Sequence, residues 1–257
     1  MNPLTESPTR ASSEASAPVR MRSLAKQMLH RVLARFGLRV SRIRRPRGGE
    51  LYFNTGRLTP PEENSRELYE EFYRDQTALK DYYTKDRLAF YRAVSDRLQE
   101  INLALDGKDV LDVGCGTGHL LTELQRWSKP RSMSGCDFSE QAMTFSREHF
   151  PGCRFFRHDI CEPLPGSFDV VLCTEVLEHL EWPFVAIRNL LNATRKHGAL
   201  VLTVPNGRTD TANEHLNFWS PESWKVFVER ECPQCVVKTS TLLDGKNNFA
   251  LVHKSTG

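Results

Sequence analysis

The chain lacks any long apolar run. Nowhere in its 257 residues do about twenty consecutive apolar residues occur, which is the length that a membrane-spanning helix needs. The mean hydropathy is also low, at −0.47. These two deficits exclude an integral membrane protein. The hydrophobic fraction of 39% still suffices for a folded core, and the length suits one α/β domain with extensions.

Paired cysteines are scarce as well. The seven cysteines are scattered along the chain, and Cys232 and Cys235 form the single C-x-x-C pair of the sequence. A zinc site of the common type needs a second pair at ligand spacing, and a disulfide framework is typical of small secreted chains. The pattern therefore predicts reduced, mostly buried thiols in a cytoplasmic protein.

Acidic residues are missing from one region, 20–47. Residues 1–47 carry eleven Lys and Arg against two Glu, a net charge of +9, whereas the remainder carries 24 basic and 30 acidic residues, a net charge of −6. Nucleic-acid binding relies on a basic surface. Because the larger part of the chain is acidic, we do not expect it to bind nucleic acid.

Four regions follow from composition and periodicity. Residues 1–19 have no apolar period and are expected to be a disordered tail. The segment 20–47 predicts a basic amphipathic helix of about fifteen residues that ends near Gly37. This helix either packs on the protein or attaches peripherally to an anionic membrane surface, with a cleaved targeting segment or a nucleic-acid arm as further alternatives. Residues 48–104 are expected to form a helical cap and linker, and 105–257 the main domain.

The main domain alternates between strand and helix patterns. Strands are expected near 109–114, 132–137, 153–158, 168–174 and 198–205, and helices near 118–128, 139–149, 183–195 and 221–231. Such alternation predicts an α/β fold with a parallel sheet, helices on both faces, and ligands at the carboxyl ends of the strands.

The first of these strands leads into three alternate glycines, in the stretch Val110–Gly118. Glycine permits positive φ and a close approach to the backbone, and the following helix start offers free N–H groups. A dinucleotide site would show G-x-G-x-x-G, and Asp112 would repel a pyrophosphate. The stretch is therefore either a bare tight turn or a site for a cationic or hydroxyl-bearing ligand. Asp137 favours the second, since it ends the next strand, where a ribose-binding acid belongs.

Taken together, Val110–Gly118, Asp137, Asp159 and the block 168–180 resemble class I S-adenosylmethionine-dependent methyltransferases, over roughly residues 85–257. The resemblance implies a seven-stranded Rossmann-like sheet, mostly parallel, which Cys235–Leu242 and Asn248–His253 would close in antiparallel fashion. It also implies S-adenosylmethionine as cofactor. The implied cofactor-binding residues are Asp112, Gly114, Cys115, Gly116 and Gly118 around the turn, Asp137 at the ribose, Phe138, Asp159 and Ile160 near the adenine, and Glu175.

The ionisable residues Glu175, Glu178 and His179 follow the strand at 168–174. The Asn/Asp-Pro-Pro-aromatic tetrad of adenine and glutamine amino-methyltransferases is absent, as is the Pro-Cys nucleophile of cytosine-C5 enzymes. Transfer to oxygen is therefore favoured. An alcohol or phenol must lose a proton, so we predict His179 as the catalytic base, oriented by Glu178. The expected acceptor is a small molecule, either a phenolic or quinone precursor or a sugar or glycan precursor.

Two alternatives stay open. The segment from Glu175 to His179 resembles the metal-binding segment of O-methyltransferases that act on ubiquinone precursors or on the terminal ribose of small RNAs. With His215, the residues Glu175, Glu178 and His179 would then hold a divalent cation, and the protein would be a metal-assisted ribose 2′-O-methyltransferase on RNA ends. We favour the metal-free base. The other alternative is a non-catalytic partner that keeps the fold.

Two further segments are expected to border the site. The loop 207–220 is predicted to close over the acceptor, where Phe218 and Trp219 would offer an aromatic face, although Trp219 suits core packing equally well. Helices before the first strand commonly cover the cofactor in the family that this chain resembles. Four residues before that strand could therefore line the pocket: Tyr73, Tyr82, Tyr83 and Arg87. Alternatively, the aromatic ones only pack against the rest of the protein.

Overall fold

The computed structural model describes residues 39–42, 51–54, 66–75 and 85–255, and the chain divides into two compact units, Met1–Leu58 and Thr59–Gly257. In the first unit, β1 (Arg39–Arg42) pairs antiparallel with β2 (Leu51–Asn54). The sequence did not predict this pair: β1 lies in the basic segment 20–47, just after the expected end of its helix near Gly37, and β2 lies within the expected helical cap. Valine, tyrosine and phenylalanine in these strands favour extended backbone. The predicted tail and the helix ending near Gly37 lie outside the described residues.

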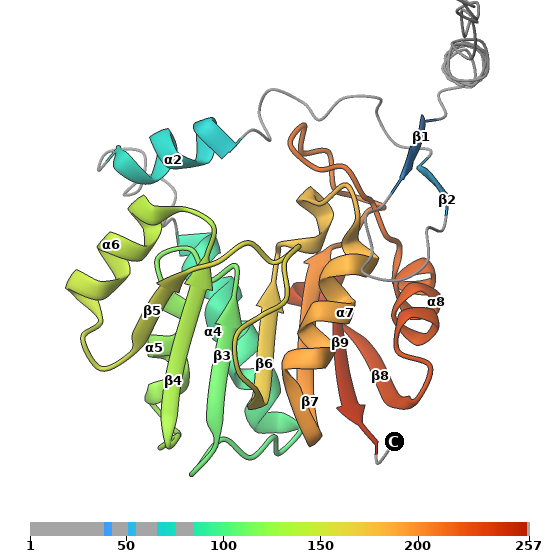
Figure 1. The fold of residues 1–257 in the computed structure, drawn as a ribbon. Coiled ribbons are helices and arrows are strands. Elements are labelled where there is room, and N and C mark those ends of the chain that lie inside the picture. The colour runs from blue at the N-terminus through green and yellow to red at the C-terminus, as the bar shows by residue number, and fades with distance from the viewer. Residues whose placement is uncertain (1–38, 43–50, 55–65, 76–84, 256–257) are drawn as a thin grey trace, which may run out of the picture. The chain divides into compact units, whose positions relative to one another are not determined.

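The second unit alternates helices and strands as the sequence predicted (Figure 1). Its elements are α2 (Arg66–Arg74), α4 (Lys85–Glu100), β3 (Asp109–Val113), α5 (His119–Gln125), β4 (Ser132–Asp137), α6 (Glu140–His149), β5 (Arg154–Arg157), β6 (Phe168–Thr174), η2 (Leu177–His179), α7 (Pro183–Ala193), β7 (Thr194–Pro205), α8 (Pro221–Glu231), β8 (Cys235–Leu242), η3 (Leu243–Gly245) and β9 (Asn247–Lys254).

The seven strands of this unit form one sheet in the order β5-β4-β3-β6-β7-β9-β8. Strands β3 to β7 are parallel, and β9 runs antiparallel to both of its neighbours, which confirms the predicted fold class. From β3 the chain first builds outward through β4 and β5, and then returns to add β6 on the other side. The carboxyl ends of β3 and β6 therefore border the switch point at which ligands bind in such sheets.

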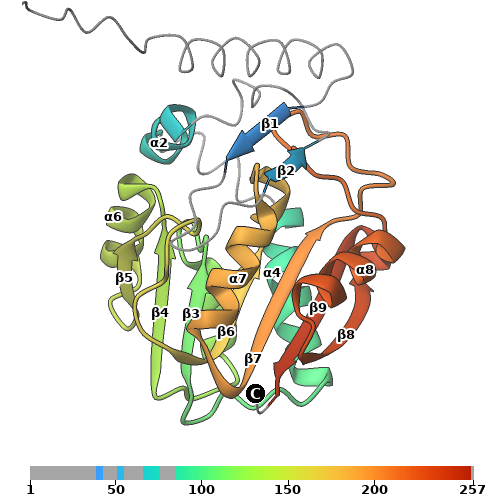
Figure 2. The ribbon, with the colours of Figure 1, turned by 45° about the vertical axis from the view of Figure 1, so that its right-hand side comes forward.

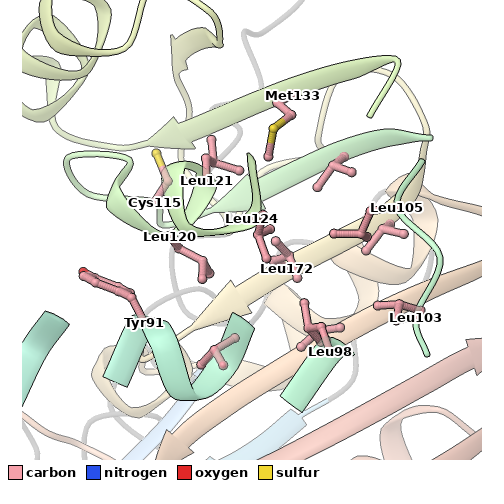
Figure 3. Close-up of a cluster of buried hydrophobic side chains, with 14 of the residues drawn as sticks. Tyr91, Leu98, Leu103, Leu105, Cys115, Leu120, Leu121, Leu124, Met133 and Leu172 are labelled. Carbon is pink, nitrogen blue, oxygen red and sulfur yellow. The ribbon is translucent and has the colours of Figure 1, made fainter. Parts of the chain in front are cut away.

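Helices cover both faces of the sheet. In Figures 1 and 2, α7 crosses in front of the strands and α4 lies behind them. One buried cluster joins α4, α5 and α6 to the sheet, and Figure 3 shows part of it, with Leu98, Leu120 and Leu172 among its members. A second cluster joins α7 and α8 to the opposite face around Trp224. The sheet is thus buried on both faces, as a parallel sheet requires.

Local signals explain where several helices begin. The Ser139 hydroxyl caps α6 by accepting the Ala142 N–H at 3.2 Å, and Ser220 caps α8 by accepting the Ser223 N–H at 3.2 Å. Pro183 opens α7 at its first turn, where a missing N–H costs nothing. None of the described helices is long and apolar enough to cross a bilayer.

The amino ends of the strands are tied by ion pairs, on the side opposite to the switch point. The Asp109 carboxylate accepts hydrogen bonds from Arg131, from Ser132 at 2.7 Å and from Arg195 at 2.7 Å. Asp169 accepts a second bond from Arg195, also at 2.7 Å. These contacts join β3, β6 and β7 far from any predicted site residue.

Replacing Asp109 by asparagine removes these ion pairs and should lower the free energy of unfolding at pH 7. The loss should be only about 1 kcal/mol, because solvent screens these partly exposed pairs. The Arg131, Ser132 and Arg195 donors lower the pKa of Asp109. Its stabilisation is therefore complete above the unfolded value of about 3.9 and is lost as the pH falls below it. Urea denaturation should show a smaller difference between wild type and variant at pH 3 than at pH 7. An undiminished difference at pH 3 would contradict this assignment.

Candidate active site

The glycine turn joins β3 to α5 and is fixed by the neighbouring strand. The N–H groups of Gly114 and Cys115 both donate to the Cys136 carbonyl, at 2.8 and 3.0 Å. Gly114 has φ of +71°, and a Cβ there would lie 2.3 Å from the Val176 Cγ2 atom. At Gly116, with φ of +51°, a Cβ would lie 2.9 Å from the Tyr73 hydroxyl oxygen. Two side chains thus approach the turn: Tyr73, which the sequence analysis named as a candidate pocket residue, and Val176, which it did not single out.

Two buried aspartates lie below this turn. The Asp137 carboxylate accepts the N–H groups of Gly116 and Ser139, each at 3.0 Å, so it links the turn to the start of α6. Burial raises the pKa of Asp137 to about 6, against the lowering effect of these N–H groups. Burial and the charge of Asp137 raise the pKa of Asp112 to about 8.

One carboxylate oxygen of Asp112 is buried without a hydrogen-bond partner among the described residues. This atom is Oδ1, and the side chain of Asp112 is 1% exposed. Such an atom fits a ligand that brings a positive charge or hydrogen-bond donors, because an unsatisfied buried acceptor is costly. The ammonium and ribose hydroxyl groups of S-adenosylmethionine meet this requirement, whereas a pyrophosphate, which has only acceptor atoms, does not.

Helix α2 covers the carboxyl ends of the strands. The Arg66 guanidinium pairs with Asp159 at 2.7 Å and lies 5.4 Å from the centre of the Phe138 ring. Tyr69 contacts Phe138 edge-on at 5.5 Å, and its hydroxyl lies 3.1 Å from Nδ1 of His179. One face of α2 therefore meets the predicted adenine-binding residues and the predicted base at once.

The same face of α2 holds the start of α6. The Glu70 carboxylate accepts the Ser139 hydroxyl at 2.8 Å and the N–H groups of Glu140 and Gln141 at 3.0 and 3.2 Å. Burial works against ionisation of Glu70, but these donors lower its pKa. A carboxylate at a helix N-terminus is favourable because the free N–H groups carry partial positive charge. Sequence reasoning identified the aromatic face of α2 but missed Arg66 and Glu70.

Glu70→Gln should loosen α2 from α6, because a neutral amide binds free N–H groups less strongly than a carboxylate. Losing about 1.5 kcal/mol of charge-assisted bonding corresponds to roughly tenfold faster amide exchange in α2. Hydrogen exchange read by mass spectrometry measures this directly. The exposed neighbour Glu71 provides the control, since Glu71→Gln should leave the exchange unchanged. Equal exchange in the two variants would show that Glu70 does not hold the helix.

Two of the predicted cofactor residues turn their side chains into the core. Cys115 is 7% exposed and belongs to the cluster of Figure 3, where burial raises its thiol pKa. Ile160 is 8% exposed and packs in the opposite cluster, while its carbonyl accepts the Asn189 amide at 2.8 Å. The structure leaves these two residues only their backbones for contact with a ligand.

Carboxylates follow β6 at two positions with different environments. Glu175 has φ of +54°, and its two oxygens accept hydrogen bonds from Thr203 and Asn247, each at 2.9 Å. Glu178 is 1% exposed, and neither of its carboxylate oxygens has a hydrogen-bond partner within the described part of the chain. Burial raises the pKa of both groups, and the charge of Glu175 raises that of Glu178 further.

Two imidazoles lie beside Glu178. The Nε2 atom of His179 lies 3.8 Å from Oε1 of Glu178, and the ring centres of His179 and His215 are 4.6 Å apart. Burial and the charge of His215 lower the pKa of His179 to about 4. Nδ1 of His215 lies 2.6 Å from Oδ2 of Asp210. The sequence named both histidines but missed Asp210, for which the spacing gave no signal.

The cluster also resembles part of a metal site. One ligand atom each from Glu178, His179 and His215 lies within 4.8 Å of the other two. Glu175, the fourth predicted ligand, is instead committed to Thr203 and Asn247. The structure therefore brings three of the four candidate ligands together.

The loop 207–220 is pinned to the cluster by its backbone. The N–H groups of Leu216 and Asn217 donate to the Glu178 carbonyl at 2.8 and 3.0 Å. Trp219 packs against Trp224 at 5.5 Å between ring centres, so it serves the core, whereas Phe218 is 48% exposed. Tyr82 and Tyr83 lie outside the described residues, and Arg87 donates to the Tyr91 hydroxyl at 3.3 Å.

A family model described as a methyltransferase domain matches residues 83–231. Ubiquinone biosynthesis O-methyltransferase from Neisseria meningitidis serogroup C is 31% identical over 143 residues, which are 48% of this chain and 59% of that protein. The mitochondrial protein of the same name from Schizosaccharomyces pombe is 35% identical over 105 residues, 38% of each chain. The chain thus spans between about two fifths and three fifths of these relatives.

Solved structures share the fold at lower identity. Magnesium protoporphyrin IX methyltransferase from Synechocystis PCC 6803, determined with bound SAH, superposes with a TM-score of 0.58 at 16% identity. The match covers 74% of this chain and 100% of that one. At this identity the match shows a shared fold.

Proposed function

Because the chain belongs to the class I S-adenosylmethionine-dependent methyltransferase family, we propose that it transfers a methyl group from this cofactor to a hydroxyl oxygen of a small molecule. The observation that carries the proposal is the cluster of the buried Glu178 with the partly buried His179 and His215, next to the glycine turn. Val176 connects the cluster to the glycine turn, because it lies between Glu175 and Glu178 in the chain and its side chain packs against Gly114. Proton-accepting groups thereby lie beside the cofactor site, as transfer to a hydroxyl requires.

Residues around the turn would hold the cofactor. Asp137 would bind the ribose hydroxyls and Asp112 the ammonium group, with Phe138 and Asp159 at the adenine. When bound, S-adenosylmethionine supplies an electrophilic methyl group on a positively charged sulfur. Asp137, whose pKa of about 6 leaves it ionised at neutral pH, favours this positive charge, whereas Asp112, with a pKa of about 8, would lose its proton when the ammonium group binds.

His179 would accept the acceptor's proton. With a pKa of about 4, its imidazole is unprotonated at neutral pH and therefore able to receive a proton. The raised pKa of Glu178 favours the protonated carboxylic acid, which can donate a hydrogen bond to the acceptor oxygen or to the histidine. Glu178 would thus orient His179 without adding charge to the site.

The acceptor class is supported by the curated relatives, which are named as ubiquinone biosynthesis O-methyltransferases. A phenolic or quinone precursor is accordingly the first candidate, and a sugar or glycan precursor the second. Methyl-labelled S-adenosylmethionine, incubated with the protein, a catechol and sugar panel and a metabolite extract, tests the proposal. Label on an oxygen supports it. Label on nitrogen or carbon contradicts oxygen transfer, and cofactor binding without transfer to any acceptor favours the non-catalytic partner.

A metal-assisted reaction is the second candidate, because three potential ligands lie within 4.8 Å of one another. A divalent cation there would lower the pKa of an acceptor hydroxyl. In the metal-free account, EDTA should leave the rate unchanged. Abolished activity that returns with magnesium or manganese would establish the metal-assisted reaction instead, and an RNA end would then join the acceptor panel.

Peripheral membrane contact through residues 20–47 stays a prediction, because the predicted helix lies outside the described residues. The net positive charge of this segment favours anionic lipid. Cosedimentation with anionic but not with neutral vesicles, lost when residues 1–47 are deleted, would support the contact.

A further inference from the structure

We propose that Asp210 is a positioning residue that holds His215 in the tautomer with Nδ1 protonated. The unprotonated Nε2 can then accept a hydrogen bond from the substrate hydroxyl that enters the cluster. The proposal rests on the proposed function, because it assigns a role within the same site. Asp210 lies in the loop 207–220 and touches none of the predicted cofactor residues in the contacts described above.

The pair is short and enclosed. Oδ2 of Asp210 lies 2.6 Å from Nδ1 of His215, and the two side chains are 8% and 10% exposed. A carboxylate can only accept at this distance, so the proton between the two atoms belongs to Nδ1 in a neutral imidazole. The lone pair of His215 is then on Nε2.

Asp210 is itself held in place. Its second oxygen accepts the Ala212 N–H at 3.1 Å, and its own N–H donates to the Asn206 carbonyl at 3.0 Å. Asn206 is 8% exposed and is tied to η3 through its amide, which donates to the Gly245 carbonyl at 2.7 Å. The carboxylate therefore stands in a fixed direction before any ligand arrives, as a positioning group requires.

The other nitrogen of His215 faces the cluster. A ligand atom of His215 lies within 4.8 Å of those of Glu178 and His179, and the two rings meet edge to face. Because Nδ1 is turned to Asp210, we assign the atom on the cluster side as Nε2. In Figure 1 the loop between β7 and α8 rises above the carboxyl ends of β6 and β7.

The two imidazoles are thus oriented by different parts of the chain. Nδ1 of His179 contacts the Tyr69 hydroxyl of α2, so its environment depends on that covering helix. His215 depends on Asp210 in its own loop. The orientation of Nε2 of His215 toward the cluster is therefore set by Asp210 and does not depend on the position of α2.

The direct test reads the tautomer without any assay. Protein labelled with ¹⁵N-histidine, at pH 7, should show His215 with a protonated Nδ1 in long-range ¹H–¹⁵N spectra, and the His215→Gln variant assigns the signal. In Asp210→Asn the amide N–H₂ can donate to Nδ1, so the proton should move largely to Nε2. The exposed Asp96 gives the control, since Asp96→Asn should leave the spectrum unchanged. A protonated Nε2 in the wild type, or an unaltered tautomer in Asp210→Asn, would overturn the proposal.

A kinetic measurement accompanies the spectra. Asp210→Asn should lower kcat about tenfold or more while the Kd for S-adenosylmethionine stays unchanged, and Asp210→Glu, which restores a carboxylate, should recover part of the loss. Unchanged kcat together with a changed tautomer would overturn the positioning role. If the wild type transfers no methyl group to any acceptor, the proposed function fails, whereas the spectra still decide the tautomer.

Discussion

Asp137→Ala is expected to weaken S-adenosylmethionine binding at least about tenfold. The substitution removes the proposed grip on the ribose hydroxyls, and each charge-assisted hydrogen bond is worth roughly 1.5–3 kcal/mol, of which about 1.4 kcal/mol already corresponds to a factor of ten. It also frees the N–H groups of Gly116 and Ser139, which the carboxylate accepts at 3.0 Å. Calorimetric titration of the cofactor measures the effect.

Asp137→Asn separates binding from folding, because asparagine keeps the size and one acceptor oxygen. Its affinity and its melting temperature should both lie between those of wild type and Asp137→Ala, because asparagine can accept only one of the two N–H groups of Gly116 and Ser139. Burial raises the pKa of Asp137 to about 6, so the carboxylate is ionised above that pH and protonated below it. Cofactor affinity of the wild type should accordingly fall as the pH drops below about 6. Equal affinity in all three proteins would show that Asp137 does not contact the cofactor.

His179→Ala should lower kcat by about 10²–10⁴, the usual contribution of a positioned general base. Because burial and the charge of His215 lower its pKa to about 4, the wild-type rate should be flat near neutral pH and fall only as the pH approaches 4. An unperturbed histidine would place this fall near about pH 6.5 instead. A pH–rate profile and steady-state kinetics check both points.

The exposed His149, at the end of α6, supplies the matched control. His149→Ala should retain the wild-type kcat, whereas His179→Ala should bind the cofactor normally and turn over slowly. A His179→Ala enzyme with full kcat would remove the proposed base. It would leave His215 as the group of the cluster to which the proton can go.

Periodicity and spacing predicted the order and kind of the sheet elements because each signal is local. The run from Val110 to Val113 is apolar and branched, the glycines stop it, and Ser139 and Pro183 mark helix starts. The predicted bounds of β6 and α8 agree with the structure, while β7 begins at Thr194, earlier than expected. There α7 ends at Ala193, and the chain turns directly into extended backbone.

The site was predictable only in part, because its remaining contacts join residues far apart in sequence. Asp137 ends β4 and His179 follows β6, the two strands on either side of β3 at the carboxyl edge of the sheet, so the sequence located them. The roles of Glu70 and Arg66 depend on where α2 docks, and no periodicity encodes that docking. Likewise, the role of Asp210 depends on the fold of its loop, which brings its carboxylate to 2.6 Å from Nδ1 of His215.

The central claim is methyl transfer from S-adenosylmethionine to an oxygen of a small molecule. The most direct test incubates the purified chain with ¹³C-methyl S-adenosylmethionine and a catechol, in the presence of EDTA, and identifies the labelled product by NMR and mass spectrometry. The account predicts a ¹³C-methoxy product in equal yield with and without EDTA, and almost none with His179→Ala. A labelled methyl group on nitrogen or carbon, or a yield that His179→Ala leaves unchanged, would contradict it.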